Sequence, residues 1–217
     1  TDPDTTIFEI IRSAATIFTV TATDDGGEAN LTYTWSVASG SPVFFSPNSS
    51  NAAKSVNADF EATGDYQIIV SVTDPEGLTV TSSVNVRVLE TASDLAISPS
   101  IVSIPYSSSQ LFAATLLDQF GSAMSSQPTT FTWNASGGGT IATDGIYTAT
   151  SAGGPYVISA TSDTFSGTSS ITVTPAAATI TLGNLAQDFD GTARSVSITT
   201  SPAGLATIVT YDGSTTA

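Results

Sequence analysis

The residues of this sequence best suited to binding chemistry are carboxylates that gather in two short acidic turns. The two turns read Asp24-Asp25-Gly26-Gly27-Glu28 and Asp74-Pro75-Glu76-Gly77. Calcium takes about six to eight oxygen ligands from carboxylates, carbonyls and waters, and it needs neither nitrogen nor sulfur. The sequence therefore predicts a calcium site with the ligands Asp24, Asp25, Glu28, Asp74 and Glu76. The simpler alternative is a pair of solvated turns, because Asp caps turns and Gly accepts a positive φ.

The composition excludes much other chemistry. The chain has 217 residues, no His and no Cys, which rules out a Ser-His-Asp triad, thiol catalysis, disulfides and zinc–thiolate sites. Its 4 basic side chains against 19 acidic ones cannot neutralise a run of phosphates, so nucleic acid is not an expected partner. No apolar run approaches the roughly 20 residues of a membrane helix, so membrane insertion is not expected. The acids lie in turns without a sign of a cleft, and we expect no enzymatic activity.

The elements that must position these turns are β-strands, because apolar residues alternate with Thr and Ser along most of the chain. In the first half such rows run through Phe18 to Ala22, Leu31 to Val37, Tyr66 to Val72 and Val84 to Val88. The pattern restarts near residue 93, with rows beginning at Phe112, Phe131, Tyr156 and Ile171. A period of two predicts half-buried antiparallel strands with Thr on the solvent face, and therefore an all-β fold.

The same order of landmarks occurs twice along the chain. Trp35 is followed by Gly64-Asp65-Tyr66, and Trp133 is followed by Gly154-Pro155-Tyr156. In Ig-like sandwiches a Trp on strand C packs between the sheets, and a Tyr near the start of strand F bonds back to the backbone as a tyrosine corner. We therefore expect tandem Ig-like antiparallel β-sandwiches, with both Trp side chains in the cores rather than on sugar-stacking platforms.

Two short junctions divide the chain into three predicted parts. Residues 1–90 are predicted to form the first sandwich and residues 93–175 the second, with a short link between them that contains neither Gly nor Pro. Residues 176–217 also carry strand patterns, but roughly 40 residues of strand bury too little surface to close a sandwich. We expect them to form an incomplete third β module, completed by further chain or by a strand of another chain.

The topology of a sandwich predicts where the acidic turns lie. The B–C loop, the F–G loop and the start of strand A share one end of an Ig-like domain. The two acidic turns fall in the predicted B–C and F–G loops, so their carboxylates should converge at that end together with Asp2 and Asp4. By the same geometry, an ion between the two modules would be bound by Glu90, Asp94, Asp118 and Asp163.

Two further features suggest binding or cross-linking. The run Pro42-Val43-Phe44-Phe45 places adjacent aromatic residues on opposite faces of one strand, so one ring is expected in the core and the other at the surface. The exposed ring is either an ordinary surface residue or part of a binding patch. Lys54 is the only lysine, and it would form an isopeptide cross-link if Asn85 and Glu61 lay beside it.

Three stretches resemble modules of large bacterial surface proteins. The first resembles polycystic-kidney-disease (PKD)-like and cadherin-like repeats through Asp24-Asp25-Gly26-Gly27-Glu28, Leu31-Thr32-Tyr33-Thr34-Trp35, Gly64-Asp65-Tyr66 and Val72-Thr73-Asp74-Pro75-Glu76-Gly77-Leu78. The second is similar to a bacterial Ig-like group 2 domain through Asp118-Gln119-Phe120-Gly121, Thr130-Phe131-Thr132-Trp133 and Asp144-Gly145-Ile146-Tyr147. The tail is similar to the opening of an MBG-type repeat through Phe189-Asp190-Gly191-Thr192, Pro202-Ala203-Gly204-Leu205 and Tyr211-Asp212-Gly213.

These resemblances imply a non-catalytic structural or adhesive segment of a large extracellular bacterial surface or filament protein. Its partners would be neighbouring domains, copies of the same protein, or a glycan or other cell-surface ligand. Calcium would be its one cofactor and would stiffen the row of modules. The alternative is an accessory carbohydrate-binding or spacer region of a secreted polysaccharide-degrading enzyme. Both interpretations place the chain outside the cell, at a bacterial surface or secreted.

Overall fold

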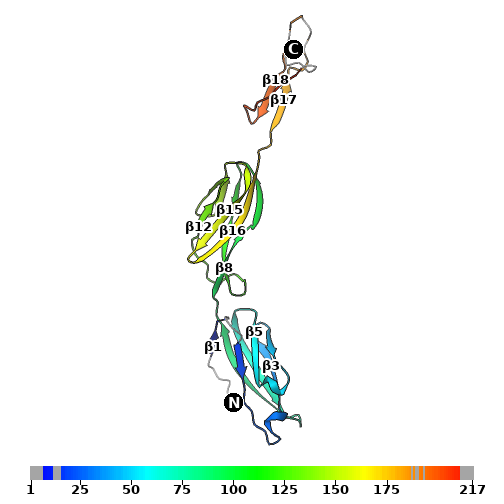
Figure 1. Ribbon diagram of the computed structural model, residues 1–217, viewed down its shortest axis with the longest axis vertical. Helices are drawn as coiled ribbons and strands as arrows, with labels where there is room; N and C mark the ends of the chain where they lie inside the picture. The colour runs from blue at the N-terminus through cyan, green and yellow to red at the C-terminus, as the bar shows by residue number, and fades with distance from the viewer. Residues whose placement is uncertain (1–6, 12–15, 187, 189–190, 193, 211–217) are drawn as a thin grey trace.

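The described chain forms an elongated row of β structure (Figure 1). The computed structural model describes residues 7–11, 16–186, 188, 191–192 and 194–210. Within these residues every regular element is a strand apart from two short 3-10 helices, which confirms the expected all-β class. We call strands β1 to β7 module 1, strands β8 to β16 module 2, and strands β17 and β18 the C-terminal hairpin. No helix in the described residues is long and apolar enough to cross a membrane.

Module 1 is a sandwich of two sheets. Its strands are β1 (Ile7–Ile10), β2 (Thr16–Thr19), β3 (Thr32–Ser39), β4 (Val43–Ser46), β5 (Ser55–Phe60), β6 (Gly64–Thr73) and β7 (Thr79–Val88), and its 3-10 helices are η1 (Glu28–Asn30) and η2 (Asn51–Lys54). One sheet has the strand order β1-β7-β6-β3, and the other has the order β2-β5-β4. β1 runs parallel to the last residues of β7, with Ile7 opposite Asn85 and Ile10 opposite Val88. The other strand pairs of module 1 are antiparallel.

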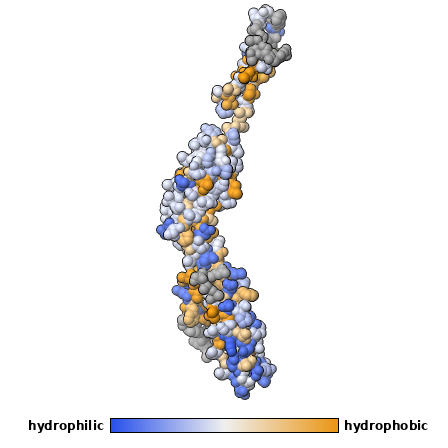
Figure 2. Space-filling model, viewed as in Figure 1, coloured by the Kyte–Doolittle hydropathy of each residue, from blue (hydrophilic) through white to orange (hydrophobic). Residues whose placement is uncertain are grey.

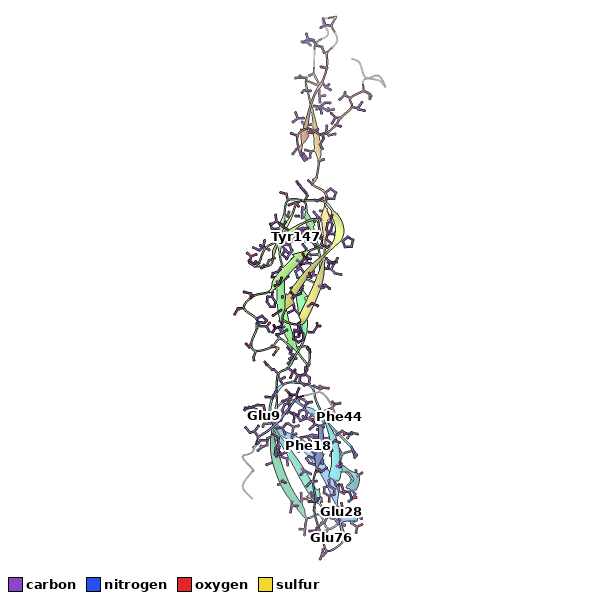
Figure 3. All side chains as sticks on the ribbon, turned by 60° about the vertical axis from the view of Figure 1, so that its left-hand side comes forward. Glu9, Phe18, Glu28, Phe44, Glu76 and Tyr147 are labelled. Carbon is purple, nitrogen blue, oxygen red and sulfur yellow. The ribbon has the colours of Figure 1, made fainter. Side chains whose placement is uncertain are left out.

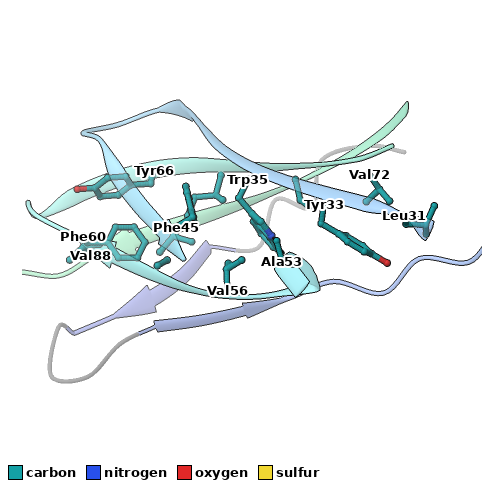
Figure 4. Close-up of a cluster of buried hydrophobic side chains, with 14 residues drawn as sticks. Leu31, Tyr33, Trp35, Phe45, Ala53, Val56, Phe60, Tyr66, Val72 and Val88 are labelled. Atoms are coloured by element: carbon teal, nitrogen blue, oxygen red, sulfur yellow. Dashed lines mark hydrogen bonds between the residues drawn. The ribbon is translucent and has the colours of Figure 1, made fainter. Parts of the chain in front are cut away.

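The core of module 1 follows from the alternation in sequence (Figure 4). Along β6 the side chains of Tyr66, Ile68, Val70 and Val72 are buried, while the residues between them are not. Trp35 of β3 packs between Phe18 and Phe45, with ring centroids 5.8 and 6.1 Å away. Its indole Nε1 donates to the Ala53 carbonyl at 2.7 Å, so the buried N–H is satisfied.

Both sequence landmarks of module 1 take their expected places. Trp35 is a core residue on the third strand of the module. The Tyr66 hydroxyl donates to the Ala62 carbonyl at 2.7 Å, four residues upstream. This bond is the tyrosine corner that the Gly64-Asp65-Tyr66 run predicted.

Module 2 is a second sandwich. Its strands are β8 (Ala92–Ser98), β9 (Ile101–Pro105), β10 (Ser109–Leu111), β11 (Ala113–Asp118), β12 (Thr132–Ala135), β13 (Gly139–Ile141), β14 (Ile146–Ala149), β15 (Gly153–Ser162) and β16 (Phe165–Thr174). One layer has the order β12-β15-β16-β9, and the other combines β10-β14-β13 with the pair β11-β8. β9 runs parallel to β16, as β1 does to β7 in module 1. Trp133 packs against a separate core that includes Phe112, Tyr147 and Ile158.

The tyrosine corner expected at Tyr156 is wrong, because a different tyrosine makes the backbone bond in module 2. Tyr147 on β14 is fully buried, and its hydroxyl donates to the Gly137 carbonyl at 3.0 Å. Tyr156 makes no hydrogen bond through its side chain within the described part of the chain. The register between β15 and β16 shifts between Gly153 and Tyr156, so this tyrosine enters the strand after a bulge. Its ring lies over Gly138, where an added Cβ would come within 2.2 Å of the ring.

The C-terminal hairpin pairs β17 (Thr179–Gly183) with β18 (Ser197–Ser201). One face carries Ile180, Leu182 and Ile198, and Figure 2 shows hydrophobic residues gathered on this part of the chain. Ile180 is 61% exposed, because two strands form a single layer that encloses no core. Phe189, Asp190 and Tyr211 to Gly213 of the MBG-like motifs lie outside the described residues. The boundaries 1–90, 93–175 and 176–217 themselves stay predictions.

Candidate functional site

The acidic pole is the end of module 1 that points away from module 2, and it consists of residues 24–28 and 74–77. The first stretch connects β2 to β3 and the second connects β6 to β7, as the sandwich topology predicted. Figure 3 shows Glu28 and Glu76 at this same end. The candidate ligands Asp2 and Asp4 lie outside the described residues.

Two of the five candidate ligands hold their own turns. The Gly26 N–H donates to Asp24 Oδ2 at 3.0 Å, and the Leu78 N–H donates to Asp74 Oδ1 at 2.8 Å. These side chains therefore satisfy backbone donors that the turns leave unpaired. Asp25 and Glu76 are exposed and have no hydrogen bond or ion pair within the described residues. The pole thus combines turn-forming carboxylates with solvated ones.

Glu28 is the most heavily bonded carboxylate of the pole. Its Oε1 accepts from the Tyr33 hydroxyl at 3.1 Å and from Asn51 Nδ2 at 3.3 Å, and its Oε2 lies 3.3 Å from Lys54 Nζ. The bond to Lys54 is the main cause that lowers the pKa of Glu28, while burial raises the pKa of the Tyr33 hydroxyl. Asn51 Nδ2 also donates to the Glu28 carbonyl at 2.7 Å. Glu28 therefore ties the loop before β3 to η2, a role that its place in an acidic turn did not suggest.

The described part of the chain contains no group of three or more Asp or Glu residues close enough to hold a metal ion. The pole therefore brings the five candidate ligands to one end of the module without joining them into a coordination group. Calcium binding by these residues stays a prediction.

The isopeptide trio is not formed. Lys54 lies against Glu28 instead of Glu61. Lys54 precedes β5 and Glu61 follows it, so the strand separates them by roughly 20 Å at about 3.3 Å per residue. Asn85 lies on β7 in the facing sheet, where it pairs with Gln67 of β6.

Three of the four carboxylates predicted to bind an ion between the modules accept hydrogen bonds from nearby protein groups. Glu90 accepts from the Ser125 hydroxyl at 2.7 Å, and Asp94 accepts from the Leu95 N–H at 2.8 Å. Asp118 is only 2% exposed, and its Oδ1 accepts two backbone N–H groups of its own turn. Asp163 lies in the turn between β15 and β16. No metal-binding group forms among them in the described chain.

The two adjacent phenylalanines separate as expected. Phe45 is buried against Trp35, whereas Phe44 is 69% exposed. Phe44 lies on the outer face of the β2-β5-β4 sheet, with Asp59 opposite it on β5. The strand period predicted one ring inside and one outside. It could not say which, because that depends on the register of β4 against β5.

A cavity of about 450 Å³ lies between the sheets of module 1, and no motif or residue pattern predicted it. Its walls include Phe8, Phe18, Trp35, Ile68 and Val84. No Asp, Glu, Lys or Arg lines it among the described residues. The cavity therefore offers apolar volume and no acid–base group.

Two family models match the sequence. Residues 11–88 match the PKD domain, and residues 178–217 match the MBG domain. The PKD match falls on module 1, and the MBG match falls on the C-terminal hairpin and the residues around it. PKD and MBG domains are typically non-catalytic repeat domains, and PKD domains are of an extracellular type. The similarity of module 2 to group 2 domains stays a prediction.

Several solved structures resemble the chain at low sequence identity. Drosophila N-cadherin EC1-4 is 14% identical, with a TM-score of 0.48, over 79% of this chain and 47% of that one. Mouse cadherin-23 EC22-24 is 19% identical, with a TM-score of 0.44, over 80% of this chain and 63% of that one. Domains 1–6 of the surface layer protein SbsC are 17% identical, with a TM-score of 0.35, over 75% of this chain and 24% of that one. This chain thus spans less than two thirds of each. No curated protein matches it.

Proposed function

We propose that this chain is a non-catalytic structural or adhesive segment of a large extracellular bacterial surface or filament protein. The observation that carries the proposal is the arrangement of two closed sandwiches in a row, joined by only three residues between β7 and β8. Such a row extends a chain and holds its ends apart. The match to PKD and MBG domains supports a repeat region of this kind.

The distribution of side chains supports a spacer more than a catalyst. Most buried residues of both modules belong to the two hydrophobic cores. The described acids hold turns, bond to neighbouring side chains or face solvent. The cavity in module 1 lacks an acid or base in its described lining. The formal net charge of -15 keeps copies of the chain apart and favours solubility.

Whole-cell labelling tests the proposed location. Antibodies raised against the folded chain are expected to stain intact cells of the source organism, and external protease is expected to remove the signal. An antibody against a cytoplasmic protein serves as the control for cell integrity. Staining only after lysis would contradict the proposal.

Calcium at the acidic pole belongs to this proposal, supported by the exposed carboxylates of Asp25 and Glu76 at the end that also holds Asp24, Glu28 and Asp74. Ligand linkage gives about 2.7 kcal/mol of stability at a hundredfold excess over Kd, which raises the Tm of a small domain by several degrees. The expected result is a higher Tm for module 1 in calcium than in chelator, lost in the pair Asp25→Asn and Glu76→Gln. Equal Tm values in calcium and chelator would remove calcium from the proposal.

Carbohydrate binding is the second candidate, and the exposure of Phe44 favours it. Aromatic rings on flat surfaces can stack against sugar rings, and Phe44 presents 69% of its surface to solvent. A glycan array with the full chain tests this role. Binding that is lost in Phe44→Ala but kept in Ile17→Ala, a 63% exposed residue of the same sheet, would support it. A blank array would exclude it for the sugars tested.

A further inference from the structure

The loop that follows β11 in module 2 is held rigidly by Asp118. The buried Asp118 Oδ1 accepts the N–H groups of Phe120 at 2.8 Å and Ser122 at 2.9 Å. The Asp118 N–H donates to the Ser122 carbonyl at 2.7 Å, and the Gly121 N–H donates to the Asp118 carbonyl at 3.0 Å. Gly121 has φ of 79°, a value that glycine adopts without strain. The turn therefore presents Gln119 and Phe120 in fixed directions.

Gln119 binds the link between the modules through both atoms of its amide. Its Nε2 donates to the Leu89 carbonyl at 2.6 Å, and its Oε1 accepts the Thr91 N–H at 2.8 Å. The Leu89 N–H in turn donates to the Ile10 carbonyl of module 1 at 3.0 Å. One peptide stretch is therefore bonded to module 1 through Leu89 N and to module 2 through Leu89 O and Thr91 N. Bending the link requires at least one of these bonds to break.

Two more contacts surround the Gln119 clamp. Phe120 packs against the hydrophobic core of module 1, although it belongs to module 2. The Glu90 carboxylate accepts the Ser125 N–H at 3.1 Å and the Ser125 hydroxyl at 2.7 Å. The loop of residues 118–125 thus touches the link on both sides of Glu90 and reaches the module beyond it.

We propose that residues 118–125 lock modules 1 and 2 into one rigid body, and that this joint contains no metal ion. Relative motion is the default for domains joined by a small interface. Here three contacts restrict the three-residue link. The Gln119 amide bonds to the link, Phe120 packs against module 1, and the Glu90 carboxylate bonds to Ser125. Two of the carboxylates that an ion would need, Glu90 and Asp118, already accept hydrogen bonds from the protein. This inference deepens the proposed spacer function, on which its biological meaning rests, but its test measures geometry alone.

Distance measurement between the modules tests the joint. The chain has no Cys, so Asn57→Cys on β5 and Thr168→Cys on β16 would supply the only two sites for spin labels. Both residues are exposed strand positions, one in each module. Pulsed electron paramagnetic resonance on the labelled full chain then reports the distribution of intermodule distances. The variants are Gln119→Ala, Gln119→Glu and Phe120→Ala. Gln110→Ala is the matched control, because the Gln110 amide bonds to the neighbouring Leu111 carbonyl and to no other group in the described part of the chain.

The parent chain and Gln110→Ala are expected to give one narrow distribution that is the same in calcium and in chelator. Gln119→Ala and Phe120→Ala are expected to broaden it by about twofold or more. Gln119→Glu keeps the size of the side chain but sets a carboxylate oxygen against the Leu89 carbonyl, so it should broaden the distribution without loss of packing. Circular dichroism confirms that each variant is folded. A broad parent distribution, a narrow one in all three variants, or narrowing only with calcium would overturn the proposal. Loss of surface staining in the labelling experiment would leave the joint untouched.

Discussion

The side-chain amide of Asn48 hydrogen-bonds both polar backbone groups of Trp35, as a neighbouring strand would. The Trp35 N–H donates to Asn48 Oδ1 at 2.8 Å, and Asn48 Nδ2 donates to the Trp35 carbonyl at 3.0 Å. Trp35 lies on β3, the last strand of its sheet, next to the bridge that Tyr33 forms with Ser50 along the same outer edge. Gln127 does the same for Leu116 of β11, with bonds of 2.8 and 2.9 Å. Each amide thus covers part of an exposed sheet edge.

Removal of the Asn48 amide should destabilise module 1. Asn48→Ala leaves the N–H and carbonyl of Trp35 without these partners, at a cost of about 1–3 kcal/mol in the free energy of unfolding. Urea unfolding followed by Trp35 fluorescence in a Trp133→Phe background measures the change. Asn57→Ala, an exposed Asn of β5, is the control and should be nearly neutral. Equal stability of Asn48→Ala and the control would contradict this role for the amide.

Module 1 should lose the stabilising contribution of the Glu28–Lys54 pair in acid. The lowered pKa of Glu28 means that its contribution to stability is present above the ordinary pKa of the carboxyl and is lost as the pH falls through the folded-state value. Glu28→Gln should therefore lower the urea midpoint at neutral pH, and its difference from the parent chain should shrink as the pH falls through the lowered pKa of Glu28. Glu76→Gln, which changes a solvated carboxylate, should show no such difference. A Glu28→Gln deficit that persists unchanged at low pH would assign the effect to packing instead of charge.

The tyrosine hydroxyls should contribute to stability only where they donate a hydrogen bond to a backbone carbonyl. Tyr66→Phe and Tyr147→Phe each remove a bond to a carbonyl and should cost about 1 kcal/mol in their own modules. Tyr156→Phe removes no hydrogen bond of the described structure and should cost much less. Thermal unfolding of the three variants gives the comparison. If Tyr156→Phe proved as costly as Tyr147→Phe, the assignment of the backbone bond to Tyr147 would fail.

Gly138 should not tolerate a side chain. An added Cβ would lie 2.2 Å from the Tyr156 ring and 2.7 Å from the Tyr147 hydroxyl, and φ at this residue is 71°. The steric clash and the strained backbone angle together predict that Gly138→Ala lowers the free energy of unfolding by roughly 2–4 kcal/mol. Gly77 also has a positive φ, of 90°, but an added Cβ there would meet no atom within 4 Å. Gly77→Ala therefore measures the cost of the backbone angle without a steric clash. The difference between the two Tm shifts measures the steric part, and no difference would show that Tyr156 moves aside.

The sequence was a good guide wherever burial follows the period of a strand. The rows through Trp35, Tyr66 and Val86 became buried faces because alternate residues of a strand point to opposite sides of a sheet. It failed at Tyr156, because a bulge after Gly153 changes the register and no local pattern announces it. It also could not choose between Phe44 and Phe45 before the pairing of β4 with β5 was known.

The candidate site was predicted at the level of loops but not of atoms. Topology placed Glu28 and Glu76 at one end of module 1, as the structure shows. The partners of Glu28 come from residues 23 and 26 positions away, Asn51 and Lys54, and nothing in an acidic turn foretells them. The Gln119 clamp was missed because an isolated Gln carries no recognisable spacing. Its one signal was the Asp118-Gln119-Phe120-Gly121 turn, whose backbone directs the amide toward the link.

The parallel pairing of β1 with β7, and of β9 with β16, decides how the chain responds to tension. In module 1 the first strand of the described residues, β1, and the strand that leads to module 2, β7, lie side by side and run the same way. A pull on the two ends of the module therefore drags β1 and β7 in opposite directions along their common axis. All the hydrogen bonds between them are loaded together in shear, instead of opening one after another as in a peeled hairpin. A tether made of such modules resists stretching until a whole strand pair gives way at once.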